Sequence, residues 1–308
     1  MIRIGTDCSG IEAPIEALKK ICNTYDLNFT HVFSSEIDKY ALQYIRDNHM
    51  PKVIFGDMTK RNIKDVPDID LYVSGFPCQP FSRANKFKTD VDPRLNLFNN
   101  CLDVIKNKTP KIFILENVKT LVTLNNGKYF QEILSILKNL DIYDVYWKVV
   151  NSKDYGIPHC RDRLYIIGIQ KNVSKYNFEF PKKKQMRDIK EFIDENDNTI
   201  MVKKECNYEL FNNIPSDSVF IDIGFRKAKF PNSNKWAPCI TAQPNMWCVP
   251  KKRKANIKEY LSLQGFPHNV IQTISDHQFK KKIGNSMTVD VIEELLINYF
   301  KNIDIIKI

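Results

Sequence analysis

The sequence has no long apolar run and none of the cysteine spacings that bind zinc. Among its 308 residues no apolar stretch reaches the roughly 18 that a membrane helix needs, and no basic segment precedes an apolar core at the start. We therefore expect neither secretion nor membrane insertion. The eight cysteines include no CxxC pair and the five histidines do not cluster with them, so we expect no metal site. A chain of this length needs no disulfide framework, which favours reduced thiols and a cytoplasmic protein.

Two glycine-containing phosphate motifs are also absent from a chain with only 10 glycines. Neither GxGxxG nor GxxxxGK[ST] occurs. This excludes a typical dinucleotide site and a P-loop.

The charge balance is strongly basic, with 46 Lys and Arg against 36 Asp and Glu, a formal net charge of +10 and a pI of about 9.0. An excess of this size favours a polyanionic partner. Residues 171–260 hold 18 Lys and Arg against 11 Asp and Glu, so most of the excess lies there. The basic runs 182–184 and 251–254 are interpreted as phosphate-contacting faces, with solvated lysines as the alternative. A nuclear localisation signal is a further interpretation of the second run.

The first 170 residues alternate short β-rich runs with amphipathic helical patterns. This alternation predicts an α/β fold, a doubly wound and mostly parallel Rossmann-like sheet with helices on both faces. Ligands of such sheets bind beyond the carboxyl ends of the strands. A helix is expected at 129–140, where apolar residues recur at helical spacing. The expected strands are 3–6, 31–34, 52–55, 71–74, 111–115, 145–150 and 164–169.

We expect a catalytic and cofactor-binding domain at 1–170 and a small, irregular domain at 171–255. Residues 256–308 are expected to return to the first domain, ending in a helix from Val289 to Ile303. Trp236 and Trp247 in the irregular region are interpreted as core residues, with base stacking as the alternative.

One cysteine lies where a nucleophile could be positioned. Cys78 follows the expected strand 71–74 and stands between Pro77 and Pro80, which limit its backbone freedom. Gly75 lets another group approach closely. Sulfur attacks only as a thiolate and only when held in line, so Cys78 is a candidate nucleophile. The alternative is an unreactive buried thiol.

Charged residues adjoin the next strands. Glu116 follows strand 111–115 and could act as an acid or hydrogen-bond partner, or else as a helix cap or solvated loop residue. Arg161 and Arg163 precede strand 164–169 and point the same way on an extended segment. They could reach one site together, or form a surface charge pair bridged by Asp162.

Three further segments suit a nucleotide-like cofactor. Residues 6–14 form a strand-to-helix turn whose backbone amides can contact a ligand. Glu36 ends the second expected strand, where a carboxylate commonly binds ribose hydroxyls. Asp57 ends the third, near where an exocyclic amine would lie. Each carboxylate alone is as readily structural, but their order at successive strand ends favours a shared site.

Taken together, these segments resemble the cytosine-C5 DNA methyltransferase family, which is S-adenosylmethionine-dependent, in family order from residue 3 to about 295. The irregular stretch 171–255 falls where the family keeps its target recognition domain. The matching pieces are Ser9-Gly10, Glu36, Gly56-Asp57, Gly75-Phe76-Pro77-Cys78-Gln79-Pro80-Phe81-Ser82, Glu116-Asn117-Val118, Arg161-x-Arg163, Leu263-Gln264-Gly265-Phe266-Pro267 and Gly284-Asn285-Ser286.

The resemblance implies a role for each catalytic candidate. Cys78 matches the nucleophile that adds to C6 of cytosine. Glu116 matches the residue that binds N3 and the 4-amino group, and Arg163 the arginine near O2 and this carboxylate. Arg161 matches a supporting companion. A base inside a duplex cannot be reached, so the cytosine would be flipped out.

The resemblance also implies that S-adenosylmethionine is the cofactor, with S-adenosylhomocysteine as product. Glu36 is expected on its ribose, with Asp57 and Met58 at adenine. Residues 79–94 are expected to close over DNA. The other implied cofactor residues are Cys8, Gly10, Ile11, Ala13, Leu97, Asn285 and Ser286, and the implied DNA-binding residues are Gln79, Ser82, Arg83 and Arg94.

The first motif departs from the family pattern. Thr6 stands where the family usually has Asp, and Cys8 where it has an aromatic residue that packs on adenine. Glu12 and Ala13 replace two later glycines. We therefore expect the methionine end of the cofactor to be held differently.

The sequence predicts a DNA (cytosine-5-)-methyltransferase that acts as a monomer on double-stranded DNA. Its compact size resembles microbial, phage or viral modification enzymes, as in restriction-modification, and a nuclear location applies to a eukaryotic host. One alternative is a tRNA cytosine-C5 methyltransferase, although the Cys-Phe-Thr signature of that branch is absent from the variable region. The other is a catalytically silent DNA-binding relative, against which the intact Cys78 and Glu116 argue.

Overall fold

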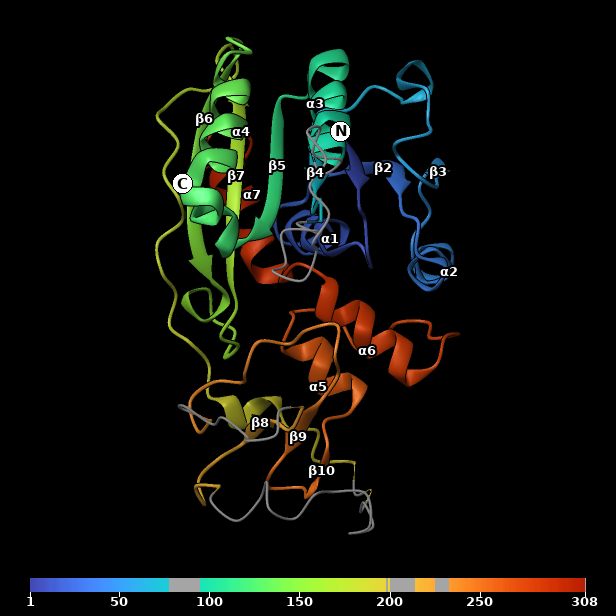
Figure 1. The fold of residues 1–308 in the computed structure, drawn as a ribbon, viewed down its shortest axis with the longest axis vertical. Helices are drawn as coiled ribbons and strands as arrows, with labels where there is room; N and C mark the ends of the chain where they lie inside the picture. Colours follow the sequence, from blue (N-terminus) through green and yellow to red (C-terminus); the bar gives the residue numbers. More distant parts are fainter. Residues whose placement is uncertain (78–94, 198, 200–213, 225–232, 308) are drawn as a thin grey trace.

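The computed structural model describes residues 1–77, 95–197, 199, 214–224 and 233–307. They form a larger lobe on a seven-stranded sheet and a smaller lobe on a three-stranded sheet (Figure 1). Within these ranges no helix has the length and apolar character needed to cross a membrane.

The large sheet has the strand order β3-β2-β1-β4-β5-β7-β6. Neighbours from β3 to β5 are parallel, whereas β7 is antiparallel to both β5 and β6. A short connection joins β6 to β7, and short connections join antiparallel neighbours. The prediction of a mostly parallel α/β sheet is therefore confirmed. The strands are β1 Ile2–Asp7, β2 Phe29–Ser35, β3 Val53–Phe55, β4 Leu71–Ser74, β5 Ile112–Val118, β6 Tyr143–Asn151 and β7 Asp162–Gln170.

Helices cover both faces of this sheet. Helices α3 and α4 lie in front of it and α7 behind it in Figure 1. The apolar residues of α1 and α7 share one buried cluster with β1, while those of α3 and α4 share a second with β5. All four residues of β4 are buried, as expected for a strand covered on both faces. The helices are α1 Ala13–Tyr25, α2 Lys39–Asn48, α3 Leu95–Lys108, α4 Lys128–Lys138 and α7 Val289–Asn302.

Most of the expected strands were too short by one to three residues at an end, and two of these differences lie at the predicted site. Strand β5 continues through Val118, and β7 begins at Asp162, because Glu116 pairs with Tyr165 and Val118 with Arg163. Arg163 therefore lies inside a strand and not before one. Short 3₁₀ turns in the described chain are η1 Ile63–Asp65, η2 Lys119–Val122, η3 Leu124–Gly127, η4 Ser152–Asp154 and η5 Ile189–Phe192.

Of the two tryptophans expected in the core, Trp247 is buried and Trp236 is only partly buried. Trp247 lies in β9 and is 8% exposed, whereas Trp236 is half-buried with Lys153 Nζ 4.3 Å from its ring centroid. The strands of the smaller lobe are β8 Phe220–Asp222, β9 Met246–Cys248 and β10 Arg253–Lys254, and the helices that follow them in the chain are α5 Ile257–Ser262 and α6 Asp276–Asn285.

One residue of the basic run 251–254, Arg253, is not exposed to a partner, contrary to the interpretation of the whole run as a phosphate-contacting face. Arg253 is only 2% exposed. Its guanidinium donates to both carboxylate oxygens of Glu259, at 2.8 and 2.9 Å, and lies 3.4 Å from Asp197. A buried carboxylate needs such a partner, so Arg253 joins β10 to α5.

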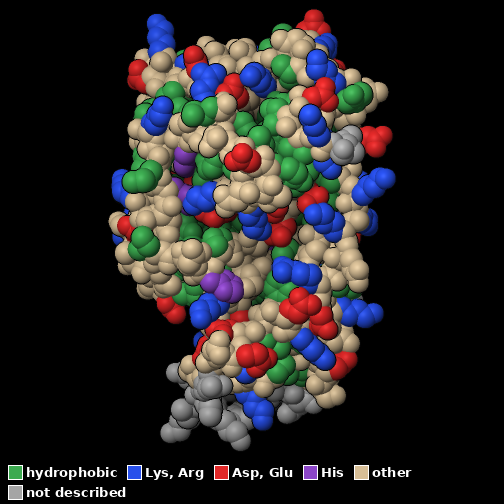
Figure 2. All heavy atoms as spheres, turned by 180° about the vertical axis from the view of Figure 1, so that it is seen from behind, with side chains coloured by type: hydrophobic (Ala, Val, Ile, Leu, Met, Phe, Trp, Pro, Cys, Tyr) green, Lys and Arg blue, Asp and Glu red, His purple; other side chains and the backbone are tan. Residues whose placement is uncertain are grey.

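Charges of both signs are mixed on the face of the molecule seen from behind. In the view from behind, Lys and Arg side chains of the described residues are interspersed with Asp and Glu on both lobes (Figure 2). In the run 182–184, Lys183 pairs with Asp154 and Lys184 with Glu294. Two of the three lysines in this run are therefore paired with carboxylates of the same chain.

Candidate active site

A cleft of about 680 Å³ lies at the carboxyl ends of the parallel strands. Its wall combines strand ends of the large sheet with Thr241 and Ala242 and with the end of α6. Such a position is typical of ligand sites in α/β sheets. The structure brings ten of the sequence-predicted residues together here: Cys8, Gly10, Glu36, Asp57, Met58, Leu97, Glu116, Arg161, Arg163 and Asn285.

The remaining predicted residues are placed differently. Ala13 and Ser286 line a small adjoining hollow of about 30 Å³, which shares Cys8 and Gly10 with the cleft. The side chain of Ile11 is completely buried in the hydrophobic core, so only its backbone could contact a ligand. Outside the described residues lie Cys78, Gln79, Ser82, Arg83 and Arg94.

Glu116 and Arg163 form an ion pair at the base of the cleft. Arg163 Nε lies 3.1 Å from Glu116 Oε1, and the two side chains are 17% and 12% exposed. Burial raises the pKa of Glu116 above its ordinary value, and the charges of Arg163 and Arg161 oppose this only in part. Glu116 thus keeps its proton to a higher pH than a free glutamate, which suits a group that must donate as well as accept.

The segment leading into Cys78 begins directly beside this carboxylate. Asn117 Nδ2 donates to the backbone oxygen of Phe76 at 3.0 Å. A Cβ added at Gly75 would lie 3.7 Å from Glu116 Oε2 and 2.8 Å from Met287. Gly75 is therefore in ordinary contact distance of Glu116, and a larger residue there would have to displace the end of the Met287 side chain. Pro77 also lines the cleft.

Arg161 serves a different purpose from Arg163. It is 2% exposed, and it donates to the backbone oxygens of Ile240 at 2.8 Å and Ser286 at 2.7 Å. It thereby ties the smaller lobe and the end of α6 to β7. Asp162 does not bridge the two arginines, because its carboxylate binds Lys119 and Asn151.

Glu36 organises the opposite side of the cleft. Its Oε2 accepts from the backbone N–H of Gly10 at 2.8 Å, and its Oε1 from those of Ile37 and Asp38 at 2.8 and 2.9 Å. Gly10 has φ 56°, and a Cβ there would meet no heavy atom within 4 Å. The turn therefore presents open backbone to the cleft.

The end expected to hold adenine combines apolar and polar groups. Cys8 Sγ lies 3.8 Å from Met58 Sδ, and Leu97 lines the same wall. Burial raises the pKa of the Cys8 thiol, so this sulfur stays neutral. Asp57 Oδ1 accepts from the N–H and hydroxyl of Thr59, which holds the pKa of Asp57 below its usual range.

A buried ion pair between Arg61 and Asp7, which lies next to the turn formed by residues 8–11, was not predicted from the sequence. Arg61 contacts Asp7 with both terminal nitrogens, one of them 2.5 Å from Asp7 Oδ2, and the side chains are 6% and 0% exposed. Tyr72 donates to the same oxygen at 2.6 Å. The pair joins the segment that carries Met58 to the end of β1. The sequence signal that could have indicated this pair is Asp7, an acidic residue at the end of an otherwise largely apolar strand.

A second ion pair joins α6 to the start of α2, and its Asp38 lines the cleft. Lys282 in α6 contacts Asp38, whose Oδ1 also accepts from the first backbone amides of α2, at Tyr40 and Ala41. Burial alone would raise the pKa of Asp38, but its bonds to Lys282 and these amides lower it overall. No motif pointed to Lys282.

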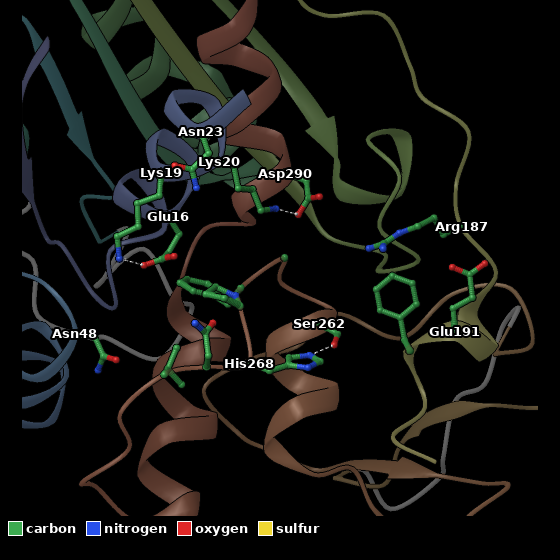
Figure 3. A pocket seen from close by; sticks show the side chains of 16 residues that line it. Glu16, Lys19, Lys20, Asn23, Asn48, Arg187, Glu191, Ser262, His268 and Asp290 are labelled. Atoms are coloured by element: carbon green, nitrogen blue, oxygen red, sulfur yellow. Dashed lines mark hydrogen bonds and ion pairs between the residues drawn. The ribbon is translucent and has the colours of Figure 1, made fainter. Parts of the chain in front are cut away.

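Another cavity, of about 690 Å³, lies beside α1, α7 and residues 262–270 (Figure 3). Its labelled charges are largely paired with one another, Lys19 with Glu16 and Lys20 with Asp290. It contains none of the predicted site residues. Within the described ranges no group of three or more His, Cys, Asp or Glu is placed to hold a metal ion.

Comparison with known proteins identifies the family to which this chain belongs. The sequence profile of the C-5 cytosine-specific DNA methylases matches residues 7–301. The type II methyltransferase M.NgoBI of Neisseria gonorrhoeae is 39% identical over 274 residues, covering 86% of this chain and 84% of that protein. M.HaeII of Haemophilus aegyptius is 37% identical over 272 residues, with the same coverages.

A solved structure agrees in fold. The crystal structure of the S. pombe Dnmt2 methyltransferase superposes with a TM-score of 0.71 at 18% identity, covering 98% of both chains. Because the family profile spans nearly the whole chain, this protein belongs to the C-5 cytosine-specific DNA methylase family and is a DNA cytosine-5-methyltransferase.

Proposed function

We propose that the enzyme methylates C5 of a flipped-out cytosine through a covalent bond between Cys78 and C6. The observation that supports this best is the Glu116–Arg163 pair, 3.1 Å apart in the cleft, beside the Gly75–Pro77 segment that leads into Cys78. C5 of cytosine is a poor nucleophile until C6 carries an adduct, and covalent catalysis divides that difficult step.

Each residue has a distinct role in this mechanism. The Cys78 thiolate bonds to C6 while Glu116 holds N3 and the 4-amino group, so that electron density moves toward C5. Arg163 orients the Glu116 carboxyl group and reaches toward O2. After C5 gains the methyl group, its proton passes to solvent water, the C5–H electron pair restores the ring double bond, and Cys78 leaves C6 as a thiolate.

The cleft fits S-adenosylmethionine, which the family uses. This cofactor supplies an electrophilic methyl group. The open backbone at Gly10, the carboxylate of Glu36 and the apolar wall of Met58 match an amino-acid-bearing nucleoside. Glu36 would bind the ribose and Asp57 the adenine amine. The other residues that we propose to contact the cofactor through their side chains are Cys8, Ala13, Leu97, Asn285 and Ser286.

We also propose that residues 171–255 recognise the target and that residues 79–94 close over the flipped base, with Gln79, Ser82, Arg83 and Arg94 on DNA. The exposed lysines 252 and 254 support a backbone contact from the small lobe. Type II relatives from bacteria support a role in restriction-modification in a microbial cytoplasm. We propose in addition that the enzyme acts as a monomer.

Bisulfite sequencing of DNA from a methylation-free bacterial host that expresses the protein tests this function. Expression of Cys78→Ser in the same host is the matched control. We expect methylated cytosines in one short recurrent context with the wild type and none with the variant.

Two results would contradict the proposal. Unmethylated DNA from a host with abundant folded wild-type protein would exclude DNA as the substrate, and labelled-methyl transfer to tRNA would then identify an RNA enzyme. Full methylation by Cys78→Ser would exclude the covalent mechanism.

A further inference from the structure

Glu12 occupies an unusual position for a glutamate. It is completely buried, it lies at the residue before α1, and its backbone has φ 61° and ψ 46°. This left-handed conformation is disfavoured for side chains other than glycine, so something must hold it. Four residues earlier Cys8 has φ 50°, and Gly10 between them has φ 56°. Two residues of this turn other than glycine, Cys8 and Glu12, are thus in a disfavoured backbone conformation.

The Glu12 carboxylate binds two neighbouring strands. Its Oε1 accepts from Thr6 Oγ1 at 2.8 Å and from Ser34 Oγ at 2.6 Å. Thr6 in β1 and Ser34 in β2 are register partners, so Glu12 lies under both strands where they end. His31 Nε2 lies 3.5 Å from the same oxygen and 2.9 Å from Ser34 Oγ.

Further hydrogen bonds connect Thr6 to the turn formed by residues 8–11. Thr6 has one hydroxyl hydrogen, and a carboxylate can only accept, so Thr6 Oγ1 is left as an acceptor toward Ser9 Oγ, 2.7 Å away. Ser9 Oγ in turn accepts from the backbone N–H of Ser35 at 3.0 Å. The next residue is Gly10, whose N–H binds Glu36 in the cleft.

The carboxylate is held in its charged form. Burial would raise the pKa of Glu12, but the hydrogen bond and charge of His31, followed by His49 and Ser34, lower it overall. A charged acceptor forms stronger hydrogen bonds than a neutral one, which favours a single orientation of the Thr6 and Ser34 hydroxyls.

We propose that Glu12 is a positioning residue for the cofactor, acting through Thr6, Ser9 and Ser34 to hold the turn 8–11 in its binding conformation. It touches neither the cleft nor the reacting atoms, since it lines none of the cleft's wall. The inference rests on the proposed binding of S-adenosylmethionine. Glu12 stands where the family usually has glycine, and we assign to its side chain the support of this turn.

Glycine at position 12 is the sharpest test, because it accepts φ 61° without strain and removes only the side chain. Isothermal titration calorimetry with S-adenosylhomocysteine compares the wild type with Glu12→Gly and Glu12→Gln. Loss of two hydrogen bonds to a charged group predicts about tenfold or greater weakening for Glu12→Gly. Glu12→Gln keeps an oxygen acceptor, so its affinity is expected within about threefold of the wild type.

Glu16→Gln is the matched control, since Glu16 is also a buried carboxylate of α1 but binds Lys19 and not the turn. Its affinity should be unchanged. With methylatable DNA, Glu12→Gly should raise the KM for S-adenosylmethionine while leaving kcat and the KM for DNA nearly unchanged. A purely structural role would lower thermal stability without this selective effect.

Three results would overturn the inference. Unchanged affinity of folded Glu12→Gly would show that the turn holds itself. If that variant does not fold, Ser34→Ala removes one of the two donors to Glu12, and unchanged affinity there would have the same meaning. A wild-type protein that binds no S-adenosylhomocysteine would overturn the proposed cofactor and this inference with it.

Discussion

Arg163 Nε lies 3.1 Å from Glu116 Oε1, although the two residues are 47 positions apart. The antiparallel pairing of β5 and β7 creates this contact, because Glu116 lies opposite Tyr165 and Arg163 opposite Val118. The pair thus depends on two rigid strands rather than on loops. Side chains held in this way suit a site that must keep a base within hydrogen-bond distance.

Replacing Glu116 by Gln should abolish most of the activity while preserving shape. A positioned acid or base typically contributes 10²–10⁴-fold, so we expect a loss of about that size in the single-turnover methylation rate. DNA affinity, measured by fluorescence anisotropy, should change little. A Glu116→Gln enzyme within about threefold of the wild-type rate would exclude Glu116 from proton transfer.

The same substitution should affect stability in a pH-dependent way. Because burial raises the pKa of Glu116, its protonated form stabilises the folded state below the unfolded pKa, and this contribution is lost as pH rises through the folded pKa. Gln does not titrate. Urea unfolding at pH 5 and pH 8 should therefore show Glu116→Gln gaining free energy of unfolding relative to the wild type at the higher pH. An equal difference at both pH values would contradict a raised pKa.

Removing Arg61 should leave Asp7 charged and unpaired in the interior. Breaking a buried pair typically costs about 3–5 kcal/mol, so we expect a loss of that order in the free energy of unfolding of Arg61→Met. Lys171→Met is the control, because its partner Asp141 is exposed and such pairs contribute about 1 kcal/mol or less. Equal effects of the two substitutions, measured by urea unfolding, would show that the Asp7–Arg61 pair is not structurally important.

The basic run 251–254 offers a comparison within four residues. Lys252 and Lys254 are exposed, whereas Arg253 is buried against Glu259. If the lysines contact phosphates, each Lys→Gln change should reduce the slope of log K against log[salt] by about 1. Arg253→Gln should instead lower stability. A binding affinity independent of salt would contradict a phosphate contact by this surface.

The fold could be predicted because its signals are local. Alternating strands and helices placed all seven strands of the large sheet, and the spacing of Phe130, Ile133, Leu134 and Leu137 gave the buried face of α4. Since ligand sites form at strand ends, the order of Glu36, Asp57 and Glu116 along the chain was enough to gather them in one cleft.

The missed features depend on contacts between distant segments. Arg161 was expected beside the catalytic carboxylate, but it also donates to Ile240 and Ser286, 79 and 125 residues away. Lys282 pairs with Asp38 across 244 residues. Such pairs have no periodicity, and four consecutive basic residues such as 251–254 do not reveal which one turns inward.

The most direct test of the covalent mechanism is trapping by 5-fluorocytosine. A duplex carrying 5-fluorocytosine at the methylated position found by bisulfite sequencing is incubated with the enzyme and S-adenosylmethionine. Fluorine at C5 cannot leave as a proton, so a Cys78–C6 adduct cannot resolve. Denaturing gels and peptide mass spectrometry should show a stable protein–DNA complex joined at Cys78 and none with Cys78→Ser. An active enzyme that forms no such complex, or forms it at another residue, would contradict the proposed mechanism.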